Sequence, residues 1–309
     1  MRHLLKTLLT TVTALAVVGL AQAQAPTPDE ELALAALEGL MAQPSERALP
    51  IIKKVLTGSQ TTLVKQRALF VLSQMDSPEA QQILVQTARS TDAAMRGEAI
   101  RSIGIGGDTK SLDALLDVYK SGDGAVKQDV LQAWLIAGRK EAVYQPAVNA
   151  KSEEEATNAI HILGAMGATE ELRKLGSQPK ASPGLLEAYA ISGDLESLRK
   201  LATGTGERSM RIEAVRRIGI ISGDSARTTL QEIYTSNTDP EFKEAALQGL
   251  LIAGDEQGVL KLYRASKSSE EKRSLLRVLS TMDGDAALKE IDEALAGTAQ
   301  PAKKQEQKK

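Results

Sequence analysis

The chain has 309 residues, a formal net charge of −2, no cysteine, and only 3% aromatic residues. The absence of cysteine excludes disulfide bonds, thiolate metal sites, cysteine nucleophiles and a lipid-modified cysteine. Nucleic acid is not an expected partner, because its phosphates require a basic surface and its bases stack on aromatic side chains.

The first 23 residues have the pattern of a secretory signal peptide. Arg2 and Lys6 flank the start of an uncharged, mostly apolar stretch that ends at the small-x-small cleavage site Ala21-Gln22-Ala23. This stretch is shorter than the roughly 20 residues that a spanning helix needs, so we expect no stable membrane span. The pattern predicts cleavage after Ala23, a linker at residues 24–29, and a periplasmic or secreted protein.

From residue 30 to residue 296 the sequence repeats with a period of about 30 residues. Gly-Asp pairs or related breaks follow apolar helical runs, at Pro44, Asp76, Gly107, Gly138, Gly167, Gly193, Gly223, Gly254 and Gly284. The apolar pattern of each repeat predicts two helices. Because these helices cannot bury their apolar faces alone, neighbouring repeats must stack. The predicted fold is all-α: an α-solenoid of about nine stacked helical pairs.

One repeat shows the expected local structure. Residues 93–106 place Met95, Ala99, Ile100 and Ile103 on one face of a helix. Gly107 is expected to end this helix in the left-handed conformation, and Asp108 to cap the next helix. Tyr119, at the end of that second helix, is expected to seal the seam between repeats with its hydroxyl in solvent, as are Tyr234 and Tyr263.

Several later features refine the prediction. Pro146 is expected to interrupt its helix, and the proline-containing segment 178–184 to leave short helices around it. Ser152 and Glu155 have the spacing of a capping box. The basic tail at residues 297–309 has no large apolar side chain and is predicted to be disordered.

A recurring motif carries a family resemblance. Met95-Arg96-x-x-Ala99-Ile100-x-x-Ile103-Gly104, followed by Gly107-Asp108, recurs from Met210 and in part from Phe242. It resembles the HEAT repeat, especially the short variant found in phycobilin lyases. The resemblance covers about residues 30–296 and implies a solenoid that binds a protein partner on its concave face. The acid-then-base spacing at Asp92/Arg96 resembles the side-chain ladder that links HEAT units.

The sequence gives little support for a catalytic function. Ser-x-x-Lys occurs at Ser177, Ser197 and Ser269 without its companion motifs. His161 is the one histidine outside the signal segment, so no metal, cofactor or catalytic site is expected. The sequence therefore favours an exported, non-catalytic protein-binding scaffold. A chaperone that binds unfolded clients and an enzyme related to the lyases remain alternatives.

The solvent side of each first helix is the predicted binding surface. Steps of about 100° per residue place Arg101 opposite the core. Its register gives a polar column for protein binding: Phe70, Arg101, Gln132, His161, Glu187, Arg216, Gln248 and Arg277. A second column holds Arg67, Glu98, Asp129, Asn158, Glu213 and Ser274. The arginines favour an acidic or extended peptide. Alternatively, the positions are simply solvated, with each arginine paired to an acid such as Glu98 or Glu213.

Overall fold

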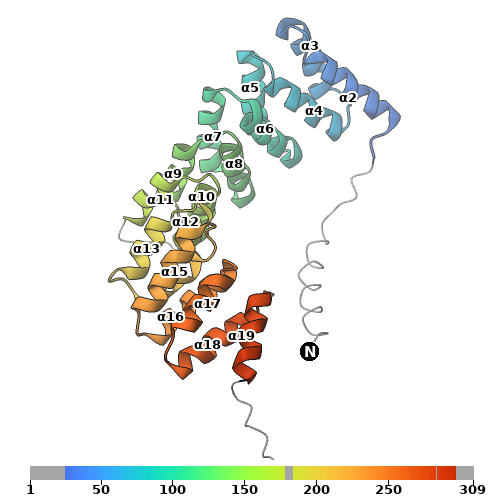
Figure 1. The fold of residues 1–309 in the computed structure, drawn as a ribbon. Helices are drawn as coiled ribbons and strands as arrows, with labels where there is room; N and C mark the ends of the chain where they lie inside the picture. Colours follow the sequence, from blue (N-terminus) through green and yellow to red (C-terminus); the bar gives the residue numbers. More distant parts are fainter. Residues whose placement is uncertain (1–24, 178–183, 283, 297–309) are drawn as a thin grey trace, which may run out of the picture. The chain divides into compact units, whose positions relative to one another are not determined.

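The computed structural model describes residues 25–177, 184–282 and 284–296. In this part of the chain every regular element is a helix, and the helices form nine consecutive pairs (Figure 1). Their bounds, pair by pair, are α2 Pro28–Leu40 and α3 Ser45–Thr57; α4 Thr62–Ser73 and α5 Pro78–Thr87; α6 Ala93–Gly106 and α7 Thr109–Ser121; α8 Gly124–Ile136 and α9 Lys140–Val148; α10 Glu153–Ala165 and α11 Thr169–Gly176; α12 Gly184–Ile191 and α13 Leu195–Thr203; α14 Arg208–Ile218 and α15 Asp224–Ser236; α16 Pro240–Ile252 and α17 Glu256–Ala265; α18 Ser269–Leu279 and α19 Asp285–Ala296.

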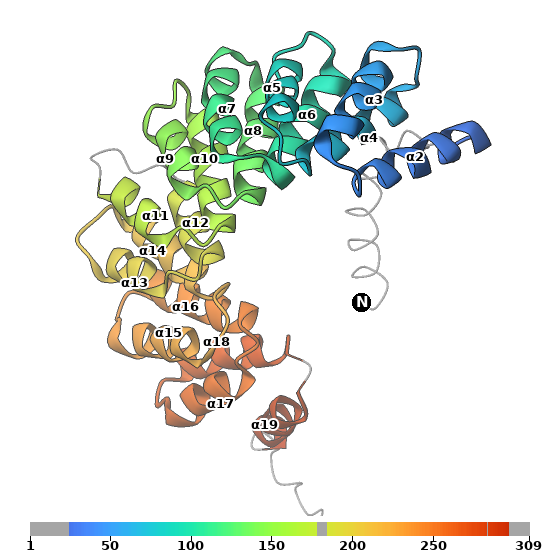
Figure 2. The ribbon, with the colours of Figure 1, turned by 90° about the horizontal axis from the view of Figure 1, so that it is seen from above.

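The described helices divide into two compact units, with the boundary between Ala114 and Leu115 inside α7. In unit 1 the first helices α2, α4 and α6 pack against one another in that order. In unit 2 the first helices α8, α10, α12, α14, α16 and α18 do the same. The second helices α9, α11, α13 and α15 lie along one side of this row (Figure 2). Within each unit, this is the stacking predicted for a solenoid.

The breaks predicted from the sequence lie between the two helices of each pair, and glycine ends four of the first helices by one shared geometry. Gly138, Gly167, Gly193 and Gly254 have φ between 60° and 74°. In each case the next amide donates back to a carbonyl in the last turn, as Arg139 N does to Trp134 O (2.9 Å). This is the Schellman arrangement, which satisfies helix carbonyls that lack an intrahelical partner.

The prediction that Gly107 adopts the left-handed conformation is wrong. Gly107 has φ −69° and ψ 146°, because α6 continues through Gly106 and Gly107 itself is the extended C-cap. The cap predicted at Asp108 is confirmed, since its Oδ1 accepts a hydrogen bond from the amide of Ser111 (2.7 Å). Gly-Asp therefore ends one helix and begins the next, but by more than one backbone geometry.

One register position of the first helices lies at the centre of the packing. It is occupied by a buried side chain in eight consecutive repeats: Leu72, Ile103, Trp134, Leu163, Tyr189, Ile218, Leu250 and Leu279. We call this the core position. The prediction that Trp134 is a core residue is thus confirmed, and the ring of Tyr119 lies against it with centroids 5.8 Å apart.

Small residues directly after the core position let the first helices of unit 2 approach closely. A Cβ at Gly219 of α14 would lie 2.5 Å from the carbonyl oxygen of Gly249 in α16. A Cβ at Gly164 of α10 would lie 3.0 Å from the Cα of Ala188 in α12. Backbone therefore packs against backbone at these two crossings, which brings neighbouring repeats close together.

Tyrosine, lysine and glutamate from successive repeats join at the seams. Tyr119 of α7 donates its hydroxyl to Glu155 of α10 (3.1 Å), and Lys127 of α8 donates to the same carboxylate (3.0 Å). The ammonium of Lys127 also lies 5.5 Å from the Tyr119 ring centroid. The seam position predicted for Tyr119 is therefore correct, but its hydroxyl contacts Glu155 instead of projecting into solvent.

A second seam repeats part of this arrangement. Lys243 contacts Glu271 of the next repeat and lies over the ring of Tyr234 (5.1 Å). Burial, aided by the nearby Glu271 carboxylate, raises the pKa of Tyr234 to about 12. Lys127 and Lys243 thus each pair with an acid one repeat later. In the predicted ladder pair Asp92/Arg96, Arg96 donates to Ser90 O (3.3 Å) and Asp92 caps its own helix.

Two local predictions differ from the structure. Pro146 does not interrupt α9, which continues to Val148; the amide of Asn149 still donates to Gln145 O (3.0 Å). The capping box at Ser152 is only half formed: Ser152 caps the Glu155 amide, whereas Glu155 accepts from the amide of Lys151. The short helices around segment 178–184 are confirmed in α11 and α12, each of eight residues. Residues 178–183 themselves, the signal segment and the tail lie outside the described residues.

Candidate interaction surface

The eight residues of the predicted polar column all lie two positions before the core position. None of them is buried, and Arg101, Gln132 and Arg277 are exposed. The helical register used to derive the column therefore holds in both units. We call the solvent side of the first helices the first-helix face.

In unit 1 the predicted column residues contact neighbours on their own helix. Arg101 pairs with Glu98 of α6. Glu98 was predicted to lie on the surface in the second column, but its side chain is buried, and Ser102 donates to its other oxygen (3.4 Å). Phe70 lies under the guanidinium of Arg67, 4.8 Å from ring centroid to Cζ.

In unit 2 column residues also contact each other across repeats. His161 Nε2 of α10 lies 3.6 Å from Glu187 Oε2 of α12. Arg216 of α14 donates to Gln248 of α16 (3.0 Å) and also contacts Glu213 of its own helix (3.2 Å). The structure thus brings neighbouring column residues together in pairs, and Arg101 and Arg216 both contact carboxylates within the chain.

A second row on the same face is apolar, and the sequence analysis did not identify it. Two positions after the core position, unit 2 exposes Ile136 (52% exposed), Ile191 (50%), Ile220 (44%) and Ile252 (60%). Ala165 holds this position in α10 and is also exposed, whereas the polar Thr281 holds it after α18. We call the four isoleucines and Ala165 the isoleucine row. Ile105 occupies the corresponding position in unit 1.

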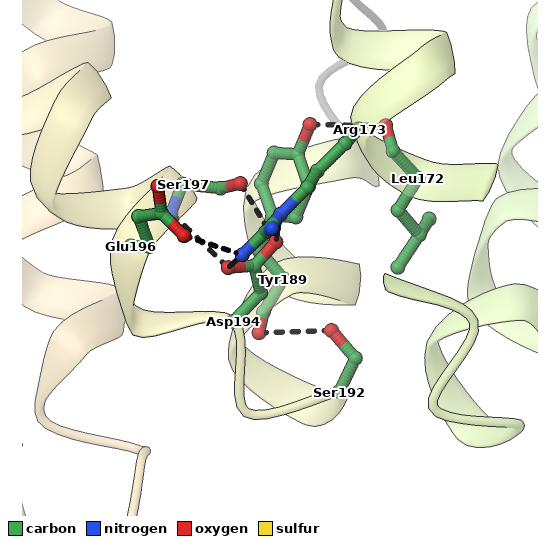
Figure 3. A network of polar contacts seen from close by, with 7 residues as sticks. All are labelled: Leu172, Arg173, Tyr189, Ser192, Asp194, Glu196 and Ser197. Carbon is green, nitrogen blue, oxygen red and sulfur yellow. Dashed lines mark hydrogen bonds and ion pairs between the residues drawn. The ribbon is translucent and has the colours of Figure 1, made fainter. Parts of the chain in front are cut away.

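A mixed polar and apolar cavity of unit 2 lies among α11, α12, α13 and the start of α14. It has a volume of about 490 Å³ and is lined in part by Leu185, Leu201 and Met210. Its polar end holds Arg173, whose Nε and Nη2 donate to the two oxygens of Asp194 (2.8 and 2.7 Å; Figure 3). Arg173 also contacts Glu196 (2.9 Å).

This polar network has a structural role. Burial opposes ionisation of Asp194, but hydrogen bonds from Arg173 and Ser197 outweigh it and lower the pKa of the carboxyl. Asp194 caps α13 through the Ser197 amide (3.2 Å), and Tyr189 donates to Leu172 O (3.0 Å), which ties α12 to α11. These contacts hold α11, α12 and α13 together at the polar end of the cavity.

The described residues offer little for metal chemistry or membrane insertion. They contain no group of three histidine, aspartate or glutamate side chains placed to hold a metal ion. Among the same residues, none of the helices is both long and apolar enough to cross a bilayer.

The comparison with known protein families supports the repeat architecture. Residues 50–134 match the family model for HEAT repeats, which confirms the predicted resemblance over that segment. No curated protein matches the chain. Among solved structures, human deoxyhypusine hydroxylase is 17% identical, with 88% of this chain and 93% of that chain covered and a TM-score of 0.32. An engineered protein is 20% identical, with coverages of 86% and 88% and the same TM-score. The CpcE–CpcF complex of the phycocyanin lyase from Nostoc is 17% identical, with coverages of 84% and 97% and a TM-score of 0.31.

Proposed function

We propose that the protein is an exported, non-catalytic scaffold that binds a protein partner on its first-helix face. The stacked helical pairs supply a rigid surface, and HEAT repeats commonly mediate protein interactions. The observation that carries the proposal is the isoleucine row of unit 2, in which four large apolar side chains are exposed at one register position.

The isoleucine row lies outside the buried core. Each of its four isoleucines is between 44% and 60% exposed, whereas the side chains at the core position are buried. Single exposed apolar residues are ordinary, but a contiguous apolar patch on a soluble protein marks a site of interaction. Recurrence at one register position across stacked helices makes the row such a patch.

The polar column lies one helical turn before the isoleucine row. Residues four apart are neighbours on a helix surface, so Gln132 precedes Ile136 and Arg216 precedes Ile220 on the same face. Because Arg101 and Arg216 already contact Glu98 and Glu213, these arginines offer little net positive charge to an acidic ligand. The column therefore supplies hydrogen bonds at the edge of an apolar contact.

Export rests on the signal-like pattern of the first 23 residues. A periplasmic or secreted scaffold gains no disulfides there, since the chain has no cysteine. Its stability must come from helix packing and from the polar seams between repeats.

A capture experiment tests the proposal. The full chain is crosslinked in the extracellular or periplasmic fraction of its native cells, beside a triple variant Ile191→Glu, Ile220→Glu and Ile252→Glu. The matched control carries Val148→Glu and Leu288→Glu, two exposed apolar positions outside the row. We expect one stoichiometric partner, identified by mass spectrometry, with the wild type and the control but not with the row variant.

Other outcomes separate the alternatives. Equal capture by a folded row variant would remove the first-helix face as the binding site. A broad set of clients in place of one partner would favour a chaperone. The triple variant Arg101→Ala, Arg216→Ala and Arg277→Ala measures the contribution of the polar column, and should keep thermal stability nearly unchanged because exposed ion pairs contribute little.

A further inference from the structure

The cavity among α11, α12, α13 and the start of α14 has an aromatic wall, apolar sides and a surplus of positive charge. We propose that it binds a small aromatic carboxylate, with the ring against Tyr189 and the carboxylate against Lys200 and Arg211. None of the residues that line the cavity belongs to the polar column or to the isoleucine row. The inference therefore does not depend on the proposed function.

The cavity lies at a place in the repeat that a tyrosine fills in other seams. Tyr119 and Tyr234 each stand four residues after a fully buried leucine of the second helix. In α11 the residue four positions after the fully buried Leu172 is Gly176, which lines the cavity. Glycine has no side chain, so the second helix of this repeat supplies no ring to the seam.

The glutamate of the seam is replaced as well. Glu155 and Glu271, which contact the seam lysines, stand eight residues before the core position. Met210 holds this position in α14 and lines the cavity. The cavity has a volume of about 490 Å³, whereas the cavity at the seam of Tyr234 has a volume of about 200 Å³. The two replacements thus accompany a cavity in the size range of small-molecule sites.

The core position beside the cavity is aromatic. Of the eight core positions, only Trp134 and Tyr189 are aromatic. The ring of Tyr119 packs against Trp134, with centroids 5.8 Å apart. At Tyr189 a Cβ on Gly176 would collide with the tyrosine hydroxyl, so α11 cannot carry a ring there. An aromatic ligand would supply the missing ring against Tyr189, in the tilted or offset arrangement that aromatic pairs prefer.

The other walls also suit an aromatic ring. Leu185 and Leu186 of α12 and Leu201 of α13 line the cavity together with Met210. A methionine sulfur makes favourable contacts with ring edges. Mostly apolar walls with a few polar groups are typical of small-molecule sites.

The charged residues of the cavity favour an anionic group on the ligand. Of the four that line it, Arg173, Lys200 and Arg211 are cations and Glu196 is the acid. Arg173 is already paired with Asp194 and Glu196. Within the described part of the chain, neither Lys200 nor Arg211 forms an ion pair with a carboxylate. A ligand carboxylate would therefore meet two cations whose charge the chain does not compensate.

Arg211 is held in place without being neutralised. Its Nε donates to Ala202 O (3.2 Å), and its guanidinium lies 4.9 Å from the centroid of the Phe242 ring. A carbonyl and a ring face orient the guanidinium but carry no negative charge. Lys200 is exposed on α13, so its long side chain is free to adjust to the ligand.

The equivalent cavity of unit 1 has the volume but not the chemistry. It measures about 480 Å³ and is lined by Leu56 and Met95 at the corresponding positions. Its one lining cation, Lys53, pairs with Glu79, and the core position beside it is the aliphatic Leu72. We therefore expect one bound ligand per chain.

Isothermal titration calorimetry of the full chain tests the inference. The probe is phenylpropionate, compared with cyclohexylpropionate, which lacks the aromatic ring, and with phenylpropylamine, which reverses the charge. We expect one phenylpropionate per chain, bound about two- to tenfold more tightly than the cyclohexyl acid because of the contact with Tyr189. The amine should not bind.

Variants locate the site. Leu201→Trp should abolish binding, because the larger side chain fills the cavity. Leu251→Trp is the matched control, since both leucines are 38% exposed and Leu251 does not line the cavity. Lys200→Glu should weaken phenylpropionate binding by about tenfold, whereas Lys261→Glu, at an exposed position of α17, should leave it unchanged. Circular dichroism checks that each variant is folded.

Several results would overturn the inference. They are absence of binding at millimolar phenylpropionate, equal affinity for the amine, and equal affinity for the cyclohexyl acid. Binding that Lys200→Glu leaves unchanged would place the ligand elsewhere, and this variant decides the location alone if Leu201→Trp does not fold. The alternative occupant is an aromatic side chain of a protein partner. Partner capture that Leu201→Trp abolishes, without phenylpropionate binding to the wild type, would assign the cavity to that partner and refute the small ligand.

Discussion

Glu155→Gln tests whether the polar seams hold the repeats together. The Glu155 side chain is only 13% exposed and accepts hydrogen bonds from Tyr119, Lys127 and the Lys151 amide, at 3.1, 3.0 and 3.1 Å. Glutamine keeps the shape but removes the charge, and it has one accepting oxygen in place of two, so it cannot accept on both sides as the Glu155 carboxylate does. A hydrogen bond to a charged group contributes about 1.5–3 kcal/mol.

The expected loss follows from these contacts. Allowing for the partial exposure of Lys127, we expect a loss of about 2 kcal/mol in the free energy of unfolding. For a unit of this size, that corresponds to a fall of about 4–8 °C in Tm. Glu154→Gln is the matched control, since it removes the same charge from an exposed position on the same helical turn. Thermal denaturation followed by circular dichroism measures both variants.

The pH dependence provides a second readout. Burial opposes ionisation of Glu155, but hydrogen bonds from Lys127, Lys151 and Tyr119 outweigh it and lower the pKa of the carboxyl. A carboxyl whose pKa is lower in the folded state contributes stability above its unfolded pKa, and this contribution is lost as pH falls through the folded pKa. The difference in free energy of unfolding between the wild type and Glu155→Gln should therefore become smaller below about pH 4. A Glu155→Gln variant within about 0.5 kcal/mol of Glu154→Gln at neutral pH would refute the reasoning.

Three further predictions concern packing, acid stability and processing. Gly219→Ala should cost about 1–3 kcal/mol in chemical denaturation, because its Cβ would meet backbone in α16, whereas Gly206→Ala, with open space around it, should be neutral; equal effects would contradict the packing account. Asp194→Asn should destabilise the protein at pH 7, and the variant should lose less of its free energy of unfolding on acidification than the wild type, because the carboxyl with the lowered pKa has been removed. If the free energy of unfolding of the variant depends on pH as that of the wild type does, this carboxyl is not involved in acid stability. Mass spectrometry of exported protein should find Gln24 as the N-terminal residue, and an intact Met1 would contradict cleavage after Ala23.

The repeat architecture could be predicted from the sequence because its signals are local and periodic. Most breaks combine a glycine or proline with an acid or hydroxyl residue, and the buried stripe of the first helix recurs in the same register. Trp134 could be assigned to the core from register alone, although tryptophan is rare in this chain. The nine helical pairs follow from these two signals, since each pair needs its neighbours to bury its apolar face.

Contacts between repeats could not be predicted in the same way. Glu155 had the spacing of a capping residue, and only the fold brings Tyr119 and Lys127 to its carboxylate. Glu98 had the register of a surface residue, yet its side chain is buried. The partners of Glu155 come from earlier repeats, and a single helical register carries no information about them. The partners of Glu98, Arg101 and Ser102, lie on its own helix, but the register alone did not show that its side chain is buried.

The isoleucine row depends on the core register and not on the turn that follows. In most repeats the glycine of the turn lies four residues after the core position, as Gly138 follows Trp134. In α14 the spacing is five residues, from Ile218 to Gly223, so counting back from the turn would place the row at Ile221. The exposed member is Ile220, two residues after the core position, as in the other repeats. The extra residue is accommodated in the turn itself, where Gly223 has φ 111°. Ile220 itself lies just beyond the end of α14, where its amide donates to Arg217 O (3.1 Å) and so continues the winding of the chain past Gly219. The exposed position in this repeat is therefore set by the count from the buried stripe, although the helix has already ended.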